Sequence, residues 1–335
     1  MVLAVLKSPR VLFIRTDRLG DTLLNLPAVA AMKQHLPGSV ITVLADPAVA
    51  PLLARHPAIH EVWSCQTGSG SLWWWRAVRL ARRLRTGRFH VAIVSNPHKV
   101  LHLAVFLAGI PIRVGYARKW GWTLTHTLQD DKAAAEFHEI EYNLRLLKRL
   151  GIDVPTIPSF QLPVSGDDQA AVASLLESLR VRDTDDLVAV HPWTSNPAKR
   201  WPTVRFQQLI QQLTKLPGVR PVIIGGQDAL PHVHGIMDNV SERVCNVVGR
   251  LSLGELAALL QRVRVLVTND SGPMHVAAAV GTPVIALFGT SNPGSHPKRW
   301  GPWGSHHTVI HKPLQDITVE QVLKALGRYV PCVCG

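Results

Sequence analysis

A repeated alternation of short β-branched runs with longer segments of helical periodicity constrains the fold of this chain more than any other feature. Such runs are typical of strands buried on both faces, and the helical segments between them indicate parallel strands joined by covering helices. In the first half we expect strands at residues 11–16, 40–45, 62–64, 90–95 and 113–115, and the clearest helix from Asp21 to His35.

The alternation begins again after residues 151–168, which are rich in Pro, Ser and Gly and indicate a linker between domains. Strands are expected at residues 187–191, 221–224, 246–248, 263–268 and 284–288, with helices at 204–216 and 253–261. A chain of 335 residues is too long for one ordinary α/β core, so we expect two domains, residues 1–160 and 161–335. Two open α/β sheets favour a cleft between them, with ligands at the carboxyl ends of the strands.

The net charge of +13 is distributed unevenly along the sequence. Residues 1–165 carry 20 Lys and Arg against 10 Asp and Glu, whereas residues 166–335 carry 16 against 13. We therefore expect an acidic partner to meet the first half of the chain.

Apolar runs and cysteines indicate a cytoplasmic protein. The apolar residues 2–6 end at Lys7, which makes the run too short for a membrane span or for the core of a secretory signal. The four cysteines (Cys65, Cys245, Cys332 and Cys334) form no CxxC pair, which argues against a disulfide scaffold or a zinc knuckle.

The strongest local motif is residues 268–275, Thr-Asn-Asp-Ser-Gly-Pro-Met-His, between an expected strand and a helix of small residues. The unpaired N–H groups at the start of such a helix bind phosphate, and Gly272 permits close backbone approach. The alternative is that Asp270 or Ser271 only caps the helix. A second polar turn at residues 289–293 follows the next strand and favours a ligand.

A second motif, residues 191–202, also follows an expected strand and precedes a helix. Its hydroxyls at Thr194 and Ser195 and its cations at Lys199 and Arg200 suit a diphosphate that must be stabilised as it leaves. The alternative is a solvated loop. Residues 225–228 form a third, weaker strand-end loop, in which Asp228 could hold ribose hydroxyls.

In the first half, residues 15–22 lie between the first strand and the first helix. A carboxylate here that faces the cleft could take the proton from an acceptor hydroxyl as it attacks, and Asp17 and Asp21 both compete for this role. The alternative, which spacing alone favours, is that Asp21 caps a helix beginning at Thr22.

Three motifs together carry a family resemblance. The Gly20-Asp21 turn, the stretch His-Pro-x-Thr-Ser-x-x-x-Lys-Arg-Trp-Pro ending at Pro202, and residues 269–279 resemble the bacterial lipopolysaccharide heptosyltransferases, glycosyltransferase family 9. The motifs occur in the family's order and span nearly the whole chain. The resemblance implies an α/β GT-B fold, in which two Rossmann-like domains place parallel sheets face to face across a cleft and the last helix packs back on the first domain.

The resemblance also implies a reaction and its residues. It implies inverting transfer from ADP-heptose, without metal or cofactor, with the acceptor bound by residues 1–160 and the nucleotide sugar by residues 161–335. Asp21 matches the catalytic base, Lys199 the phosphate-binding lysine and Asp270 the carboxylate facing the donor sugar. The remaining positions matching the donor nucleotide and its phosphates are Thr194, Ser195, Asp228, Leu251, Ser271, Gly272 and His275, of which Asp228 is the loosest match.

The segment from residue 62 to 129 holds ten basic residues, six of the ten tryptophans and no acidic residue. Residues 73–88 predict an amphipathic helix with an apolar stripe and an opposite face carrying Arg76, Arg79, Arg82 and Arg83. The alternative is an ordinary covering helix whose arginines lie in water, but this leaves Trp74, Trp75 and the missing acidic residues unexplained.

A basic, aromatic surface suits anionic lipid headgroups or an acidic glycolipid, and Arg113, Arg118 and Lys119 extend it. The family's acceptor is the acidic, Kdo- and heptose-bearing inner core of lipopolysaccharide. We therefore expect peripheral contact with the cytoplasmic face of the inner membrane.

Other functions fit the sequence less well. The Asp183-Thr184-Asp185 triplet precedes a strand instead of following one, which favours a linker turn over a metal-binding DxD motif. His306, His307 and His311 have no carboxylates to complete a zinc site. The basic stretch lacks a nucleic-acid docking motif. Two alternatives stay open: a GT-B enzyme with another nucleotide-sugar donor or a surface-glycan acceptor, and a non-catalytic sugar-nucleotide-binding homologue.

Overall fold

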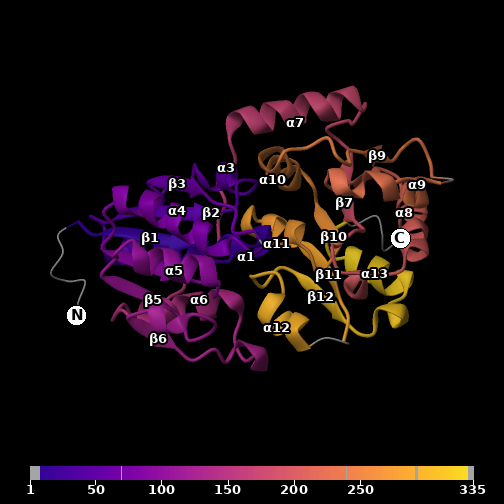
Figure 1. Cartoon of the computed structure of the whole chain (residues 1–335). Coiled ribbons are helices and arrows are strands. Elements are labelled where there is room, and N and C mark those ends of the chain that lie inside the picture. The colour runs from indigo at the N-terminus through magenta and orange to yellow at the C-terminus, as the bar shows by residue number, and fades with distance from the viewer. Residues whose placement is uncertain (1–7, 69, 239, 291–292, 331–335) are drawn as a thin grey trace. The chain divides into compact units, whose positions relative to one another are not determined.

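The computed structural model describes residues 8–68, 70–238, 240–290 and 293–330. These residues belong to two compact units, which divide between Phe160 and Gln161. Within the described residues, each unit is built on a six-stranded sheet whose strands are all paired in parallel. Figure 1 shows helices flanking the sheet of each unit. The α/β class predicted from the alternation of runs is confirmed.

The sheet of the first unit has the strand order β3-β2-β1-β4-β5-β6. Its central strand β1 is paired with β2 on one side and β4 on the other, and the last four residues of β1 are buried. Burial on both faces explains why this strand reads as an unbroken apolar run. The strands are β1 (Arg10–Ile14), β2 (Val40–Ala45), β3 (Glu61–Ser64), β4 (Val91–Val94), β5 (Ile112–Tyr116) and β6 (His126–Leu128).

Helices cover the two faces of this sheet. Leu12 and Ile14 of β1 belong to a buried cluster with α4 and α5, whereas Phe13, which points the other way, lines a small cavity with Val29 of α2. Helix α6 packs against α2. The helices are α1 (Leu19–Leu23), α2 (Leu26–His35), α3 (Ala50–Leu53), α4 (Trp73–Thr86), α5 (Lys99–Leu107) and α6 (Glu139–Lys148), with 3-10 turns η1 (Gly121–Thr123) and η2 (Lys132–Ala134).

Of the two helices expected in the first unit, one is divided in two and the other is present. The single helix expected from Asp21 to His35 is wrong, because the chain forms α1 and α2 with Asn25 between them as the N-cap of α2. Pro27 has no backbone N–H and fits only the first turn of a helix, so the helix must restart just before it. The amphipathic helix expected at residues 73–88 is confirmed as α4, whose stripe of Ala77, Leu80, Ala81 and Leu84 is buried.

The sheet of the second unit has the order β12-β11-β10-β7-β8-β9. Counted from β7, this is the same order as in the first unit, namely the 3-2-1-4-5-6 arrangement of dinucleotide-binding folds. Ligands bind such sheets beside the carboxyl ends of the two strands where the order reverses, here β1 and β4, or β7 and β10. The strands are β7 (Asp186–His191), β8 (Val219–Ile223), β9 (Cys245–Asn246), β10 (Val265–Asn269), β11 (Val284–Phe288) and β12 (Thr308–His311).

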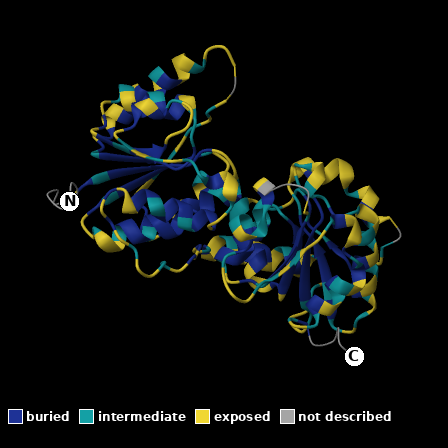
Figure 2. Ribbon diagram, turned by 90° about the horizontal axis from the view of Figure 1, so that it is seen from below, coloured by how far each residue is buried: buried dark blue, intermediate teal, exposed yellow. Residues whose placement is uncertain are grey.

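The core of the second unit joins alternate residues of β7, β10 and β11 to helices α8, α9 and α13. Helix α13 thus buries its apolar face against α8 and β11 of its own unit. Figure 2 shows the buried residues concentrated in the sheets and on the helix surfaces against them. The helices are α7 (Gly166–Ser178), α8 (Thr203–Lys215), α9 (His234–Met237), α10 (Leu253–Arg262), α11 (Gly272–Ala279), α12 (Pro297–Trp300) and α13 (Val319–Leu326), with 3-10 turns η3 (Pro197–Lys199), η4 (Gln227–His232), η5 (Pro293–Ser295) and η6 (Leu314–Asp316).

Candidate active site

Asp21 lies in α1, directly after the carboxyl end of β1 and so at the position where the strand order of the first sheet reverses. The N-cap of α1 is Arg18, three residues earlier, and Asp21 does not cap the helix. The capping alternative is therefore wrong, because the helix begins at Leu19. The Asp21 carboxylate instead accepts a hydrogen bond from Nη2 of Arg15, and its side chain is 17% exposed.

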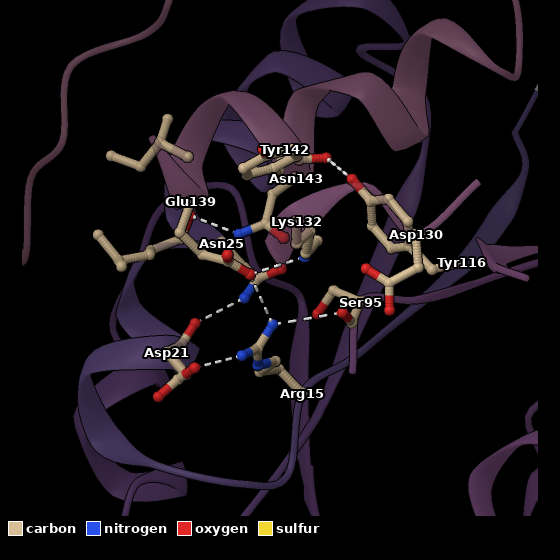
Figure 3. A network of polar contacts seen from close by, with 12 residues as sticks. Arg15, Asp21, Asn25, Ser95, Tyr116, Asp130, Lys132, Glu139, Tyr142 and Asn143 are labelled. Atoms are coloured by element: carbon tan, nitrogen blue, oxygen red, sulfur yellow. Dashed lines mark hydrogen bonds and ion pairs between the residues drawn. The ribbon is translucent and has the colours of Figure 1, made fainter. Parts of the chain in front are cut away.

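Arg15 connects Asp21 to other polar groups of the first unit (Figure 3). Its Nε donates to Oδ1 of Asp17 at 2.7 Å, and its Nη1 lies 3.2 Å from Oε1 of Glu139 and 3.3 Å from the carbonyl oxygen of Ser95. The guanidinium therefore holds several acceptors at once, which its planar fork of donors permits. Both carboxylates considered as the base, Asp17 and Asp21, bind this one cation.

Burial raises the pKa of Asp21 above its ordinary value, and the cation of Arg15 works against this rise. The negative charges of Asp17 and Glu139 add to it. Burial also opposes the charge of Arg15, but the surrounding carboxylates outweigh this effect and raise the pKa of Arg15. Arg15 therefore stays charged, and Asp21 is a carboxylate whose proton affinity is greater than that of a solvated aspartate, as suits a general base.

In the second unit, the two motifs that follow β7 and β10 lie side by side, as the pairing of these strands requires. Asn269 ties them together: its Oδ1 accepts from the backbone N–H of Trp201 at 2.9 Å, and its Nδ2 donates to the carbonyl of Pro192 at 2.9 Å. The Trp201 ring is fully buried against Phe206. The loop is thus anchored at both ends, and the half-buried Thr194 and Lys199 lie between the anchors.

Lys199 and Asp270 form an ion pair, with Nζ 2.6 Å from Oδ2 and side chains that are 20% and 10% exposed. The hydroxyl of Thr194 approaches the backbone carbonyl of Asp270 at 3.5 Å. The lysine expected to bind phosphate and the carboxylate expected to face the donor sugar are therefore in direct contact. Ser195, beside Thr194, is exposed.

Ser271 occupies the N-cap position of α11, but its side chain makes no capping hydrogen bond. Its Oγ lies 3.1 Å from Nδ1 of His191 and 3.0 Å from Oγ1 of Thr268. Burial lowers the pKa of His191 to about 4, so this histidine is neutral and serves as a hydrogen-bonding partner. The capping alternative fails for the Ser271 hydroxyl, while Gly272 and the buried His275 begin the helix as expected.

The remaining residues expected to contact the donor nucleotide follow β8 and β9, on the same carboxyl side of the sheet. Asp228 is exposed in the first turn of η4, and Leu251 is half-buried just before α10. Gly225 is required in this loop, because a Cβ there would lie 2.8 Å from the ring of Trp193.

The basic residues of the first unit have different surroundings. Arg76, Arg79 and Arg83 are exposed on α4, while Arg83 also donates to the carbonyl of Ser64 at 2.9 Å. Arg118 is exposed and paired with Asp130 at 3.4 Å, and Lys119 is exposed. Arg113 is half-buried and donates from Nε to the carbonyl of Thr123 at 2.7 Å, so its guanidinium is committed to the backbone.

Sequence reasoning missed Glu139 and Lys132. Glu139 is fully buried at the start of α6, and Lys132 Nζ lies 2.8 Å from its Oε1. A helical wheel of α6 offered the signal, because Glu139 falls on the same side as the buried Tyr142, Asn143 and Leu146. A charged residue on an apolar helix face is rarely buried unless it is paired.

Two further observations bear on the alternatives. Within the described ranges, no three or more His, Cys, Asp or Glu residues are grouped so that they could hold a metal ion, and His306, His307 and His311 form no such group. None of the helices in the described part of the chain combines the length and the apolar character needed to cross a membrane.

Comparison with known proteins identifies the class. The chain is 28% identical to lipopolysaccharide heptosyltransferase 2 of Salmonella typhimurium, covering 95% of this chain and 97% of that protein. The crystal structure of a family 9 glycosyl transferase from Veillonella parvula matches with a TM-score of 0.87 and 25% identity over 96% of this chain and 97% of that one. The structure of E. coli ADP-heptose LPS heptosyltransferase II matches with a TM-score of 0.81 and 25% identity over 96% and 98%.

The two parallel-sheet units are those of GT-B heptosyltransferase structures, so the chain is a glycosyltransferase. It belongs to glycosyltransferase family 9 (heptosyltransferase), whose sequence profile matches residues 77–327. The resemblance to glycosyltransferase family 9 that the three motifs carry is thereby confirmed.

Proposed function

We propose that this enzyme transfers a heptose from ADP-heptose to the acidic inner core of lipopolysaccharide, with inversion, without a metal ion and with Asp21 as the base. The observation that carries the proposal is the Asp21 carboxylate itself. It follows the carboxyl end of β1, is not used as a helix cap, and is held by the buried Arg15. The raised pKa of this carboxyl, caused mainly by burial, gives it a greater proton affinity than a solvated aspartate, as suits a general base.

The proposed step is a direct displacement. Asp21 takes the proton from an acceptor hydroxyl while the hydroxyl oxygen forms a bond to the anomeric carbon of the heptose. The bond from that carbon to the diphosphate oxygen breaks, and its electron pair leaves with ADP. Attack from the side opposite the leaving group inverts the anomeric configuration.

The second unit supplies the groups that would stabilise the departing diphosphate. Lys199 provides a partly buried cation, and the first turn of α11 presents backbone N–H groups beside Gly272. Thr194, Ser195, Ser271 and His275 surround the same strand ends. In the structure Lys199 is paired with Asp270, so a bound diphosphate would share or replace this partner, leaving Asp270 to the donor sugar.

Asp228 and Leu251 complete the proposed donor contacts. We assign the ribose hydroxyls to the exposed carboxylate of Asp228 and the adenine ring to the half-buried side chain of Leu251. Asp228 follows β8, which pairs with β7, and Leu251 follows β9, which pairs with β8. Both therefore lie on the carboxyl side of the same sheet, which supports the assignment.

We also propose that the first unit binds the acceptor and touches the cytoplasmic face of the inner membrane. Trp74 and Trp75 of α4 are 45% and 49% exposed, and Trp122 after β5 is 67% exposed. An unbroken chain of ring contacts runs from Trp73 through Trp120 and Trp122 to Phe106, with centroids 5.2–5.6 Å apart. Exposed aromatic rings beside exposed arginines are typical of membrane interfaces.

Two other proposals are less well supported. A different nucleotide-sugar donor or a surface-glycan acceptor would use the same base and phosphate groups, and is separated by comparing ADP with UDP release. A non-catalytic homologue is disfavoured because Asp21, Lys199 and Asp270 are all in place.

Substitution Asp21→Asn tests the proposed base. The amide keeps the shape of the carboxylate but cannot accept the proton, so turnover should fall by about 10²- to 10⁴-fold while ADP binding, measured by calorimetry, stays unchanged. Near-normal turnover of this variant with ADP-heptose and a Kdo-bearing acceptor would show that Asp21 is not the base.

A further inference from the structure

The first unit contains a buried chain of alternating charges that the transfer step does not by itself require. It runs from Asp21 through Arg15 to Glu139 and on to Lys132 (Figure 3). Arg15, Glu139 and Lys132 are each at most 8% exposed in their side chains. Removing charges from water is costly, and a buried ion pair often adds little to stability compared with apolar residues of the same size.

Glu139 occupies the centre of this chain. A single oxygen, Oε1, lies 3.2 Å from Nη1 of Arg15 and 2.8 Å from Nζ of Lys132. The ammonium of Lys132 also lies 4.2 Å from the centre of the Tyr116 ring, whose hydroxyl donates to the backbone carbonyl of Tyr142 at 2.7 Å. Glu139 is therefore bound by two cations, and the second of them, Lys132 of η2, is itself packed against a ring of β5.

Arg15 binds both Glu139 and Asp21, so the position of the Glu139 carboxylate influences that of the Asp21 carboxylate. The guanidinium is planar, so fixing Nη1 on Glu139 and Nε on Asp17 also fixes the direction in which Nη2 points. Nη2 is the atom that binds Oδ1 of Asp21. Without Glu139, Nη1 would be left with the neutral carbonyl oxygen of Ser95 at 3.3 Å, and the guanidinium would hold the Asp21 carboxylate less firmly.

We propose that Glu139 is a positioning residue, which holds the Arg15 guanidinium in the one orientation that aims the Asp21 carboxylate at the acceptor hydroxyl. This inference rests on the proposed role of Asp21 as base. Glu139 does not touch substrate in this account. It acts through Arg15, and Lys132 keeps it in place.

A purely structural role for Glu139 predicts a different result. In that case Glu139 ties α6 to the end of β1, and its loss would lower the stability of the fold while kcat of the folded enzyme stayed near that of wild type. The positioning role couples Glu139 to the charge of the base. Because the negative charge of Glu139 contributes to the raised pKa of Asp21, replacing it with a neutral amide should lower that pKa. The acid limb of the pH–rate profile should then move to lower pH.

The sign of this shift depends on the charges around the two carboxylates. Asp21 is faced by Arg15, Asp17, Arg18 and Glu139. Glu139 is faced by Arg15 and Lys132, with Tyr116 on β5 and with Asp130 and Asp131 just before η2 nearby. Glu139→Gln removes a negative charge from this set and leaves both cations in place. Arg15→Gln removes a cation, so the acid limb should move in the opposite direction.

The experiment compares Glu139→Gln, Glu139→Asp and Arg15→Gln with a matched control, Glu141→Gln. Glu141 lies two residues further along α6, where its carboxylate accepts from the backbone N–H of His138 at 2.7 Å, a capping contact that glutamine can also make. The readouts are kcat and kcat/KM as a function of pH with ADP-heptose and a Kdo-bearing acceptor, and ADP affinity by calorimetry.

We expect kcat of Glu139→Gln to fall by about 10- to 100-fold, the size of effect that a misplaced reacting group produces, with ADP affinity unchanged. Its acid limb should move to lower pH, and Glu139→Asp should recover most of the wild-type limb position. If Glu139→Gln fails to fold, the other two variants still test the coupling. The acid limb of Arg15→Gln should move to higher pH, and that of Glu139→Asp, which keeps the charge, should stay near the wild-type position.

The inference is overturned if the profile of Glu139→Gln coincides with that of Glu141→Gln, or if the loss appears in ADP affinity instead of kcat. Failure of the proposed function is a separate outcome, because it appears as near-normal turnover of Asp21→Asn whatever the Glu139 variants do.

Discussion

Replacing the exposed tryptophans and arginines of α4 should weaken binding to anionic vesicles. Trp75, Arg79 and Arg82 are four and three residues apart and share the outward face of the helix, opposite the buried stripe. The two perturbations are the pair Trp74→Ala with Trp75→Ala, and the pair Arg79→Gln with Arg82→Gln. Both change side chains that the fold leaves at the surface, so the fold should tolerate them.

The expected loss of binding free energy to vesicles follows from the exposed area of the tryptophans and the charge of the arginines. Trp74 and Trp75 are 45% and 49% exposed, and a tryptophan offers up to about 250 Å². If half of the exposed area, about 120 Å² for the pair, enters the interface, the loss at about 25 cal/mol per Å² is about 3 kcal/mol, or more than 100-fold in partitioning. Two basic side chains at about 1 kcal/mol each give about 2 kcal/mol, or roughly 30-fold.

The assay is co-sedimentation with vesicles of phosphatidylglycerol and phosphatidylcholine, compared with phosphatidylcholine alone. Lys215→Gln with Lys324→Gln is the matched charge control, because both lysines are exposed in the second unit and the net charge changes equally. Higher ionic strength should reduce the effect of the arginines more than that of the tryptophans. If the control pair weakens vesicle binding as much as the arginine pair, the binding reflects net charge and the α4 surface is not the membrane contact.

Further predictions concern the donor loops and the buried charges. Lys199→Ala should weaken ADP binding by about 10- to 100-fold, the value of a charge-assisted hydrogen bond, and unchanged affinity in calorimetry would remove Lys199 from the diphosphate site. Gly225→Ala should destabilise the second unit by about 1–3 kcal/mol, since the new Cβ would lie 2.8 Å from the ring of Trp193; an unchanged denaturant midpoint would show that the loop can relax. Glu139→Leu should cost the first unit about 3–5 kcal/mol, because it leaves the cations of Arg15 and Lys132 without their shared carboxylate, and a melting temperature equal to wild type would contradict this.

The central strands and the strand-end loops were predictable because their signals are local. Each expected strand overlaps a strand in the described ranges, with boundaries that differ by one or two residues in most cases. A strand such as β1 is buried on both faces and therefore needs an unbroken apolar run. The loops after β7 and β10 were found for a similar reason, since short polar and glycine-containing segments interrupt these runs.

The strands at one edge of each sheet were missed. β6 and β12 are only partly buried, so their sequences carry no continuous apolar run and lack a clear periodicity. The break between α1 and α2 was missed because the helical periodicity continues across Asn25, and only Pro27 signals the restart. In these cases the local pattern was weak or pointed the other way.

The role of Asp21 shows how far the site could be predicted from the sequence. Spacing favoured a helix cap, the position after the strand allowed Asp17 or Asp21 as a base, and the choice of Asp21 came mainly from the family resemblance. The Asp21 carboxylate is instead held by Arg15, and another partner of Arg15, Glu139, lies 124 residues away from it in the sequence. No pattern in a single sequence reports a pairing over such a distance, so the polar network around the carboxylate could not have been predicted.

The central claim is that this enzyme moves a heptose from ADP-heptose onto the acidic inner core. A turnover assay with ADP-heptose and Kdo-bearing acceptors of defined length, read by ADP release and by the anomeric configuration of the product, tests it most directly. We expect one ADP for each new glycosidic bond, an inverted anomeric centre, and loss of both signals in Asp21→Asn. Release of UDP from a UDP-sugar in preference to ADP from ADP-heptose, or retention of anomeric configuration, would contradict it.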